Sequence, residues 1–159
     1  MALLKAGTKA PAFKAEDASG KIWSLKEIAG KWTLIYFYPK DLTPGCTVEA
    51  CTIRDVWSEF ERLGVLVLGV SKDSVHSHER FAQAKKLPFP LLADTEKVMM
   101  KKYKAWGKKK FMGREFEGTL RISYLIDPKG KIARIYEKVT PKDHAGEVLK
   151  DVLDLRSKK

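Results

Sequence analysis

The sequence predicts an α/β fold with a mixed central sheet flanked by helices. Two uninterrupted apolar segments, residues 34–38 and 65–70, have the composition of strands covered on both faces. A helical pattern lies between them, so strand, helix and strand predict a β-α-β unit with parallel strands. Further on, two extended segments flank a turn with Pro and Gly at residues 127–130, which indicates an antiparallel hairpin, and an amphipathic helix follows.

The N-terminal part predicts a hairpin and a short helix. Residues 8–23 contain a turn at Ser19 and Gly20 between two short extended segments. Ser24 is suited to cap a short helix over residues 25–29, which the next glycine would end. An N-terminal hairpin is therefore expected to precede the β-α-β unit.

The helix of the β-α-β unit is expected to begin near Thr43 and to end before Gly64. Apolar residues recur in its second half at spacings of three and four, which is typical of a helix with one buried face. These residues are Ile53, Val56, Trp57, Phe60 and Leu63.

The region after the second strand predicts a further helix, a short strand and a short helix. Asp73 or Ser74 is suited to cap the helix, and the sequence Leu-Pro-Phe-Pro at residues 87–90 is suited to end it. Residues 91–93 predict the short strand, and residues 96–103 the short helix.

Residues 104–118 are irregular and rich in Gly and Lys. We expect a surface connection there, anchored to the body by Trp106 and Phe111. Residues 120–126 and 131–136 are the predicted strands of the antiparallel hairpin.

The last predicted element is an amphipathic helix over residues 143–155. Its candidate core residues are Val148, Leu149, Val152, Leu153 and Leu155. This order of elements is compatible with a thioredoxin-like α/β fold that begins with a hairpin.

Length and composition predict one domain, residues 1–159. The chain is 44% hydrophobic and 32% charged, which suits one compact domain with a full core. Two cysteines in a chain of this length argue against a secreted disulfide scaffold, and the apolar run at the N-terminus is too short for a signal peptide. No apolar run approaches the length of about 18 residues needed for a membrane span. A cytoplasmic, reducing location is therefore expected.

The formal net charge of +11 raises a second hypothesis, a protein that binds nucleic acid or another polyanion. The lysines are spread along the chain, however, and no helix-turn-helix, zinc-finger or RNA-recognition signature is present. Clusters occur only at residues 101–102, 108–110 and 156–159. A solvated basic surface is the favoured interpretation, and a gel shift at moderate salt separates the two hypotheses.

Both cysteines lie in the helix that follows the first apolar strand. Thr43 is suited to the N-cap, where its hydroxyl can accept from an unpaired N–H, and Pro44 is suited to the first helical position. Cys46 is then the third helical residue. Its sulfur would lie among unpaired N–H groups at the positive end of the helix dipole, and both effects favour a thiolate. Cys46 is a candidate nucleophile; the alternative is an ordinary buried cysteine.

Cys51 follows Cys46 after five residues. On an ideal helix this separation gives a rise of about 7.5 Å and places the two Cα atoms about 8 to 9 Å apart. A disulfide needs Cα atoms within about 7 Å of one another. A structural disulfide is therefore not expected, and a transient one requires local unwinding of the helix. The alternative is a buried thiol on the apolar side.

No metal site and no cofactor are predicted. His76 and His78 point apart on a helix and lack a third ligand, so they and His144 are expected at the surface. Cys46 and Cys51 alone lack the two further ligands that a zinc site needs. No Gly-rich phosphate loop precedes a helix. A third hypothesis, a thiol–disulfide oxidoreductase, is weaker because such enzymes usually carry Cys-x-x-Cys.

Residues 39–46, Pro-Lys-Asp-Leu-Thr-Pro-Gly-Cys, resemble the active-site signature of peroxiredoxins, in which a proline, a threonine and the reactive cysteine recur at this spacing. Residues 47–51, Thr-Val-Glu-Ala-Cys, are similar to the bacterioferritin comigratory protein or Q-type branch, where a resolving cysteine follows five positions later. Arg121 matches the active-site arginine of the family. The resemblance extends over nearly the whole chain.

The resemblance implies roles for three of these residues in catalysis. Cys46 would attack the peroxide, Thr43 would hydrogen-bond it, and Arg121 would stabilise the thiolate and the transition state. Thr43 is a helix cap in any case, so catalysis would be an additional role. For Arg121 the alternative is an ion pair with a carboxylate at the edge of the core.

The same resemblance places four further residues around the sulfur. Pro39 would shield it from water, although the residue could simply end a strand. Backbone groups of the turn that contains Pro44 and Gly45 would contact the substrate. Glu49 is a candidate for the edge of the site, although an ordinary carboxylate on the helix face is the favoured interpretation.

The product at Cys46 would be a sulfenic acid, which condenses with a thiol to a disulfide. By resemblance, Cys51 would supply that thiol, and thioredoxin or a similar thiol protein would reduce the disulfide. The expected enzyme is a thioredoxin-dependent peroxidase, an antioxidant protein of cell redox homeostasis that reduces hydrogen peroxide and organic hydroperoxides. A monomer is expected, because this branch is often monomeric.

Overall fold

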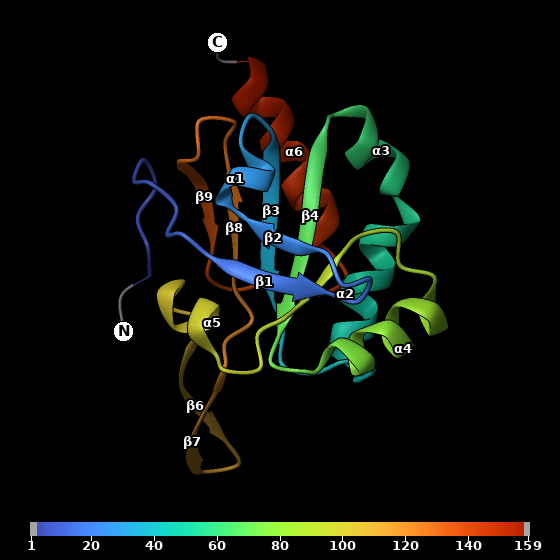
Figure 1. The fold of residues 1–159 in the computed structure, drawn as a ribbon. Helices are drawn as coiled ribbons and strands as arrows, with labels where there is room; N and C mark the ends of the chain where they lie inside the picture. The colour runs from blue at the N-terminus through green and yellow to red at the C-terminus, as the bar shows by residue number, and fades with distance from the viewer. Residues whose placement is uncertain (1–2, 158–159) are drawn as a thin grey trace.

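The computed structural model describes residues 3–157 and contains a seven-stranded sheet in the order β2-β1-β5-β4-β3-β8-β9 (Figure 1). At its centre, β3 (Trp32–Phe37) and β4 (Val65–Ser71) are parallel, as the β-α-β prediction requires. β8 (Ser123–Ile126) pairs antiparallel with β3 on one side and with β9 (Ile132–Tyr136) on the other. The predicted α/β class and mixed sheet are confirmed.

The N-terminal hairpin forms the opposite edge of the sheet. β1 (Lys14–Asp17) pairs antiparallel with β2 (Ile22–Ser24) and with β5 (Leu91–Ala93), which runs parallel to β4. Asp17 stabilises the turn, because its Oδ1 accepts the N–H of Ser19 at 2.8 Å. The hairpin predicted from residues 8–23 is therefore confirmed.

Helices cover both faces of the sheet (Figure 1). α1 (Leu25–Ile28) and α5 (Val98–Lys102) pack on one face. The other face carries α2 (Pro44–Asp55), α3 (Trp57–Arg62), α4 (Val75–Lys85) and α6 (His144–Ser157). Side chains of β3 alternate between the two apolar clusters, as the pleat of a strand requires. Within residues 3–157, no helix has the length and apolarity to cross a membrane.

The long helix predicted between β3 and β4 is divided in two. At Val56 the backbone has φ −115° and ψ 25°, which separates α2 from α3. Ile53 and Phe60 nevertheless lie fully buried in the same cluster, so the predicted apolar face is retained. The next helix, α4, has the predicted cap: Oγ of Ser74 accepts the N–H of Ser77 at 3.1 Å.

The terminal helix α6 has a narrower buried face than predicted. Val148 and Val152 are fully buried, and Leu149 and Leu155 are partly buried. Leu153 is exposed, so its prediction as a core residue is wrong. It lies about 100° around the helix from Val152, which turns it away from the sheet.

Residues 104–118 form most of a hairpin, so the prediction of an irregular connection is wrong. β6 (Trp106–Phe111) and β7 (Arg114–Thr119) pair antiparallel in a separate two-stranded sheet that projects from the body (Figure 1). The turn consists of Met112 and Gly113, with φ values of 52° and 79°. Because most of this ribbon is solvated, Lys and Gly occupy positions where a strand in a larger sheet would show apolar alternation.

Several exposures also differ from the predictions. Trp106 is partly buried against the body, but Phe111 is 66% exposed and anchors nothing. His76 is exposed as expected, whereas His78 and His144 are buried. Both buried rings have hydrogen-bond partners at each nitrogen. Glu147 lies on the same helix as His144, but the other partners, Asp41, Leu92 and Ser123, come from other elements that spacing along one helix does not reveal.

Candidate active site

Helix α2 begins at the predicted residue with a different cap contact. Thr43 is the N-cap, with φ −86° and ψ 154°, and Pro44 is the first helical residue. The Thr43 hydroxyl does not accept from the first turn; its Oγ1 donates to the carbonyl oxygen of Lys40 at 2.7 Å. The prediction that this hydroxyl accepts from the first turn is wrong, because the hydroxyl donates to a carbonyl of the preceding loop instead. The N–H groups of the first turn keep no partner within the helix.

Cys46 is the third residue of α2, and it is only 2% exposed. Its Sγ lies 3.5 Å from Nη2 of Arg121. The guanidinium and the start of the helix both favour negative charge on this sulfur. Burial opposes the charge of Arg121, but the negative charges of Cys46 and Glu49 outweigh it and raise the pKa of Arg121.

Glu49 lies on the same side of α2 as Cys46, three residues further on. It is fully buried, and its Oε1 accepts from Nη1 of Arg121 at 2.8 Å. Burial raises the pKa of this carboxyl to about 7, and the guanidinium acts in the opposite direction. The interpretation as an ordinary helix-face carboxylate is wrong, because Glu49 and Cys46 share one cation.

Two buried oxygens, Oε2 of Glu49 and the hydroxyl of Tyr36, have no hydrogen-bond partner within residues 3–157. Burial, followed by the charge of Glu49, raises the pKa of Tyr36 well above its ordinary value. Sequence reasoning missed Tyr36 because an aromatic residue in a buried strand is usually part of the core.

Arg121 reaches the site from the loop between β7 and β8. The predicted strand over residues 120–126 is shorter, because β8 begins only at Ser123. A Cβ atom at Gly45 would lie 3.1 Å from Nη2 of Arg121 and 4.0 Å from Cγ of Pro141. Glycine at position 45 therefore leaves the space that the guanidinium occupies beside Cys46.

The remaining predicted residues lie close along the chain. Pro39 is partly buried in the loop after β3, four residues before Thr43. Cys51 is partly buried on α2, and both cysteines are free thiols. α2 is continuous from Pro44 to Asp55, so an intact helix separates the two sulfurs. The structure thus brings Cys46, Glu49 and Arg121 together and leaves Cys51 apart.

Lys109, on β6, was predicted only as part of a basic cluster, but it lies near enough to Arg121 for their charges to interact. Its Nζ donates to the carbonyl oxygen of Thr119 at 2.9 Å. Burial, followed by the positive charge of Arg121, lowers its pKa. A Cβ at Gly118 would lie 3.1 Å from Cδ of Lys109, so the glycine makes room for the lysine stem. The sequence signal for this hairpin was the pair Met112 and Gly113, which forms the turn between residues 106–111 and 114–119.

Comparison with known proteins identifies the family. Residues 6–135 match the AhpC/TSA family. The chain is 42% identical over 146 residues to peroxiredoxin Bcp of Escherichia coli K12, covering 92% of this chain and 94% of that protein. It is 39% identical over 155 residues to peroxiredoxin Bcp of Bacillus subtilis 168, covering 98% and 99%.

A solved structure of the bacterioferritin comigratory protein of Xanthomonas campestris has the same fold. The TM-score is 0.87 at 32% identity, over 94% of this chain and 98% of that chain. The predicted thioredoxin-like architecture is thereby confirmed. With the family match covering most of its length, this chain belongs to the AhpC/TSA family and is a peroxiredoxin of the Bcp, or Q-type, branch.

Proposed function

We propose that this peroxiredoxin reduces hydrogen peroxide and organic hydroperoxides with Cys46 as its nucleophile. The observation that carries the proposal is the placement of Arg121, 3.5 Å from Sγ of Cys46 and 2.8 Å from Oε1 of Glu49. A buried sulfur beside a fixed cation and at a helix start is suited to react as a thiolate. The related Xanthomonas campestris protein has been studied for alkyl peroxide reduction, which supports the same substrate class here.

In the first step, the Cys46 thiolate attacks one peroxide oxygen and the O–O bond breaks. The sulfur loses two electrons and becomes a sulfenic acid, and the departing oxygen takes up a proton to leave as water or an alcohol. Negative charge moves from the sulfur to the departing oxygen. A guanidinium beside the sulfur stabilises that charge throughout, because it stays protonated and presents several N–H donors.

The loop before α2 and the first turn of the helix would form the rest of the substrate site. Thr43 would hydrogen-bond the peroxide, and Pro39 would limit access of water to the sulfur. Backbone groups of the turn at Pro44 and Gly45 would contact the peroxide oxygens. Glu49 would act through Arg121, by holding its guanidinium in place.

Cys51 is proposed as the resolving residue. Its thiol would attack the sulfenic sulfur of Cys46, with release of water and formation of an intramolecular disulfide. Because the continuous helix keeps the two residues too far apart for a disulfide, the start of α2 must unwind first. The two thiols of thioredoxin, or of a similar protein, would then reduce the disulfide, with the chain acting as a monomer.

The direct test is a coupled assay with thioredoxin, thioredoxin reductase and NADPH. Addition of peroxide should cause NADPH consumption by the native protein and none by Cys46→Ser. Full activity of Cys46→Ser would contradict the proposal.

Cys51→Ser is the matched variant, because it removes the other thiol from the same helix. It should lose turnover supported by thioredoxin yet still form one sulfenic acid, which dimedone traps and mass spectrometry detects. Unchanged turnover of Cys51→Ser would assign resolution to another thiol while leaving Cys46 as the nucleophile.

A further inference from the structure

The loop that joins β3 to α2 has a conformation that its own side chains do not explain. Leu42 has φ 62°, in the left-handed region, which costs a non-glycine residue roughly 1 kcal/mol. Its side chain is 46% exposed, so packing does not hold it there. Pro39 and Thr43, both in the proposed site, flank this strained residue. Contacts from elsewhere must therefore fix the loop.

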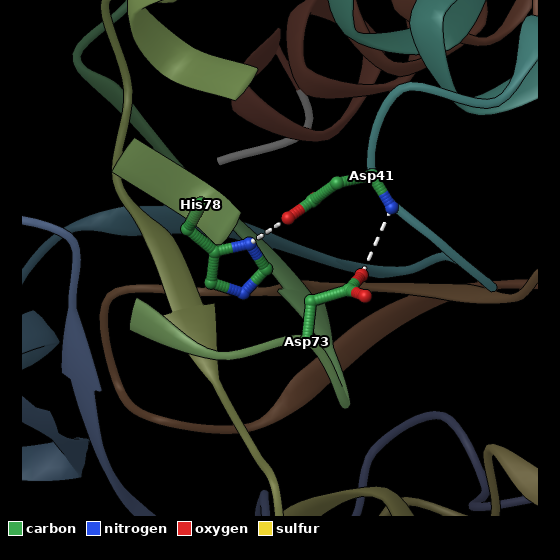
Figure 2. A group of neighbouring side chains, drawn as sticks. All are labelled: Asp41, Asp73 and His78. Carbon is green, nitrogen blue, oxygen red and sulfur yellow. Dashed lines mark hydrogen bonds and ion pairs between the residues drawn. The ribbon is translucent and has the colours of Figure 1, made fainter. Parts of the chain in front are cut away.

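Asp41, the residue before Leu42, supplies these contacts. Its buried carboxylate accepts from the hydroxyl of Tyr38 at 2.6 Å and from Oγ of Ser77 at 2.8 Å. Its Oδ2 also lies 2.7 Å from Nδ1 of His78, and its backbone N–H donates to Oδ2 of Asp73 at 2.9 Å. Figure 2 shows Asp41 linked through its side chain to His78 and through its backbone to Asp73.

His78 is the fully buried end of this network. Its Nε2 lies 2.9 Å from the carbonyl oxygen of Leu92, which can only accept a hydrogen bond. Its Nδ1 faces the Asp41 carboxylate, which also accepts. The ring of His78 therefore contacts the loop through Asp41 and strand β5 through Leu92. These contacts tie the loop to α4 and to β5.

Asp41, Asp73 and His78 are spaced closely enough to bind a metal ion, but the two carboxylates already accept hydrogen bonds from protein groups. Ligand atoms of Asp41, Asp73 and His78 lie within 4.8 Å of one another. Protein donors already occupy both carboxylate oxygens of Asp41 and Oδ2 of Asp73, to which Oγ of Ser71 donates at 2.6 Å. The cluster therefore holds the loop in place and is not a metal site.

We infer that Asp41 and His78 are positioning residues of the peroxidase site. They fix the loop of residues 38–43, and through it they place Thr43 and the first turn of α2 around the peroxide. The inference rests on the proposed function, because it concerns the geometry of peroxide attack by Cys46. Positioning matters because a displacement of about 1 Å in a reacting group can cost about 100-fold in rate.

The test compares two reactions of the same sulfur in the Cys51→Ser protein, where Cys46 is the one remaining thiol. Stopped-flow rate constants are measured with hydrogen peroxide, which needs the positioned loop, and with iodoacetamide, which does not. Asp41→Asn and His78→Gln should each lower the peroxide constant by about 10- to 100-fold. The rate constant with iodoacetamide should change by less than about threefold, because alkylation does not need the positioned loop.

Two further variants keep the test decisive. Ser77→Ala removes one donor to Asp41 and should fold even where Asp41→Asn does not; a loss of about fivefold toward peroxide is expected, the equivalent of one hydrogen bond. Asp94→Asn is the control for losing a buried carboxylate, because Asp94 accepts from the N–H groups of Met99 and Met100, away from the loop. It should leave both rate constants unchanged.

Each outcome decides between the two proposals. Folded Asp41, His78 and Ser77 variants with the native peroxide constant would overturn the positioning role and leave the proposed function intact. A parallel fall in both constants would also overturn it, because the variants would then act on the thiolate and not on its geometry. A parent protein that does not react with peroxide would overturn the proposed function, and this inference with it.

Discussion

Arg121 and Cys46 are 75 residues apart in the sequence, yet Nη2 of the one lies 3.5 Å from Sγ of the other. The same guanidinium donates from Nη1 to Oε1 of Glu49 at 2.8 Å. Its planar fork therefore spans a sulfur and a buried carboxyl on one face of α2. A lysine ammonium is a single point charge and cannot occupy both positions.

Arg121→Lys is accordingly expected to slow the reaction with peroxide by about 100-fold or more, the loss typical for removal of a transition-state donor. Lysine keeps the positive charge but not the two-pronged guanidinium, so either Sγ of Cys46 or the carboxyl of Glu49 loses its partner. Stopped-flow kinetics with hydrogen peroxide measures the effect. Arg134→Lys is the control, because the Arg134 guanidinium donates to the carbonyl of its neighbour Ala133. A rate within about threefold of the native value would contradict a role for the fork.

The stability of the protein is expected to depend on pH through Glu49. Burial raises the pKa of this carboxyl from an ordinary 4.5 to about 7, against the influence of Arg121. Between these values the folded state keeps the proton and the unfolded state releases it, so stability falls as pH rises. The pKa difference corresponds to a loss of about 3 kcal/mol at most.

Glu49→Gln removes this titration and keeps an oxygen acceptor for Arg121. Urea unfolding at pH 5 and pH 8 should show the variant gaining about 2 to 3 kcal/mol relative to the native protein at the higher pH. Glu115→Gln, an exposed change on β7, should show no such gain. A native-to-variant difference that stays constant with pH would refute the raised pKa.

His144 is expected to act with the opposite sign. Burial lowers the pKa of its imidazole from 6.5 to about 4. Below 6.5 the unfolded chain binds a proton that the folded protein excludes, so stability is lost as pH falls toward 4. Between pH 7 and pH 4, this group should lower the free energy of unfolding of the native protein by about 3 kcal/mol. Urea unfolding of His144→Gln should not show this decrease.

His76→Gln, at an exposed histidine on the same protein, is the control and should follow the native profile. Since the Glu49 and His144 effects oppose one another between about pH 4.5 and 6.5, they partly cancel in the native protein. Only the paired variants separate them. Identical pH profiles of His144→Gln and the native protein would contradict a buried neutral imidazole.

The parts of the fold that the sequence predicted depend on local chemistry. The central strands are apolar throughout because both of their faces are covered, and α2 starts at Pro44 because a proline without an N–H suits that position. β6 and β7 have no such pattern, because a solvated ribbon buries little on either side.

Contacts between residues that are distant in the sequence could not be predicted from local sequence patterns. Asp41 and His78 are 37 residues apart, and nothing within α4 shows that a carboxylate from another loop covers His78. Arg121 was placed at the site only by resemblance to a family. The burial of Glu49 was likewise missed, because a carboxylate in a helix usually faces solvent.

Gly45→Ala is expected to lower activity without lowering stability. The new Cβ would lie 3.1 Å from Nη2 of Arg121, so the guanidinium must move away from the sulfur. A loss of about tenfold in the peroxide rate constant is expected, while alanine favours the helix by up to about 1 kcal/mol. Gly146→Ala on α6 is the matched control, since no atom lies within 4 Å of its new Cβ. Equal peroxide rates in the two alanine variants would show that the space at position 45 is not needed.

Conversion of the sulfenic acid to a disulfide requires the sulfurs of Cys46 and Cys51 to meet. Cys46 and Cys51 lie on a continuous α2 and are both free. On an ideal helix their Cα atoms are about 8 to 9 Å apart, beyond the limit of about 7 Å for a disulfide. Formation of the disulfide is therefore expected to leave the first turns of α2 unwound. Amides of residues 47–51 should exchange hydrogen at least roughly tenfold faster in the oxidised protein, while those of α4 keep their protection.

Cys51→Ser treated with one equivalent of peroxide separates the disulfide from the oxidation itself. It forms the sulfenic acid but has no second thiol, so its α2 amides should remain protected. A disulfide between Cys46 and Cys51 that mass spectrometry detects alongside unchanged α2 protection would mean that the sulfurs meet across an intact helix. Such a result would contradict the geometric limit, because five residues of helix separate the two Cα atoms by more than a disulfide spans.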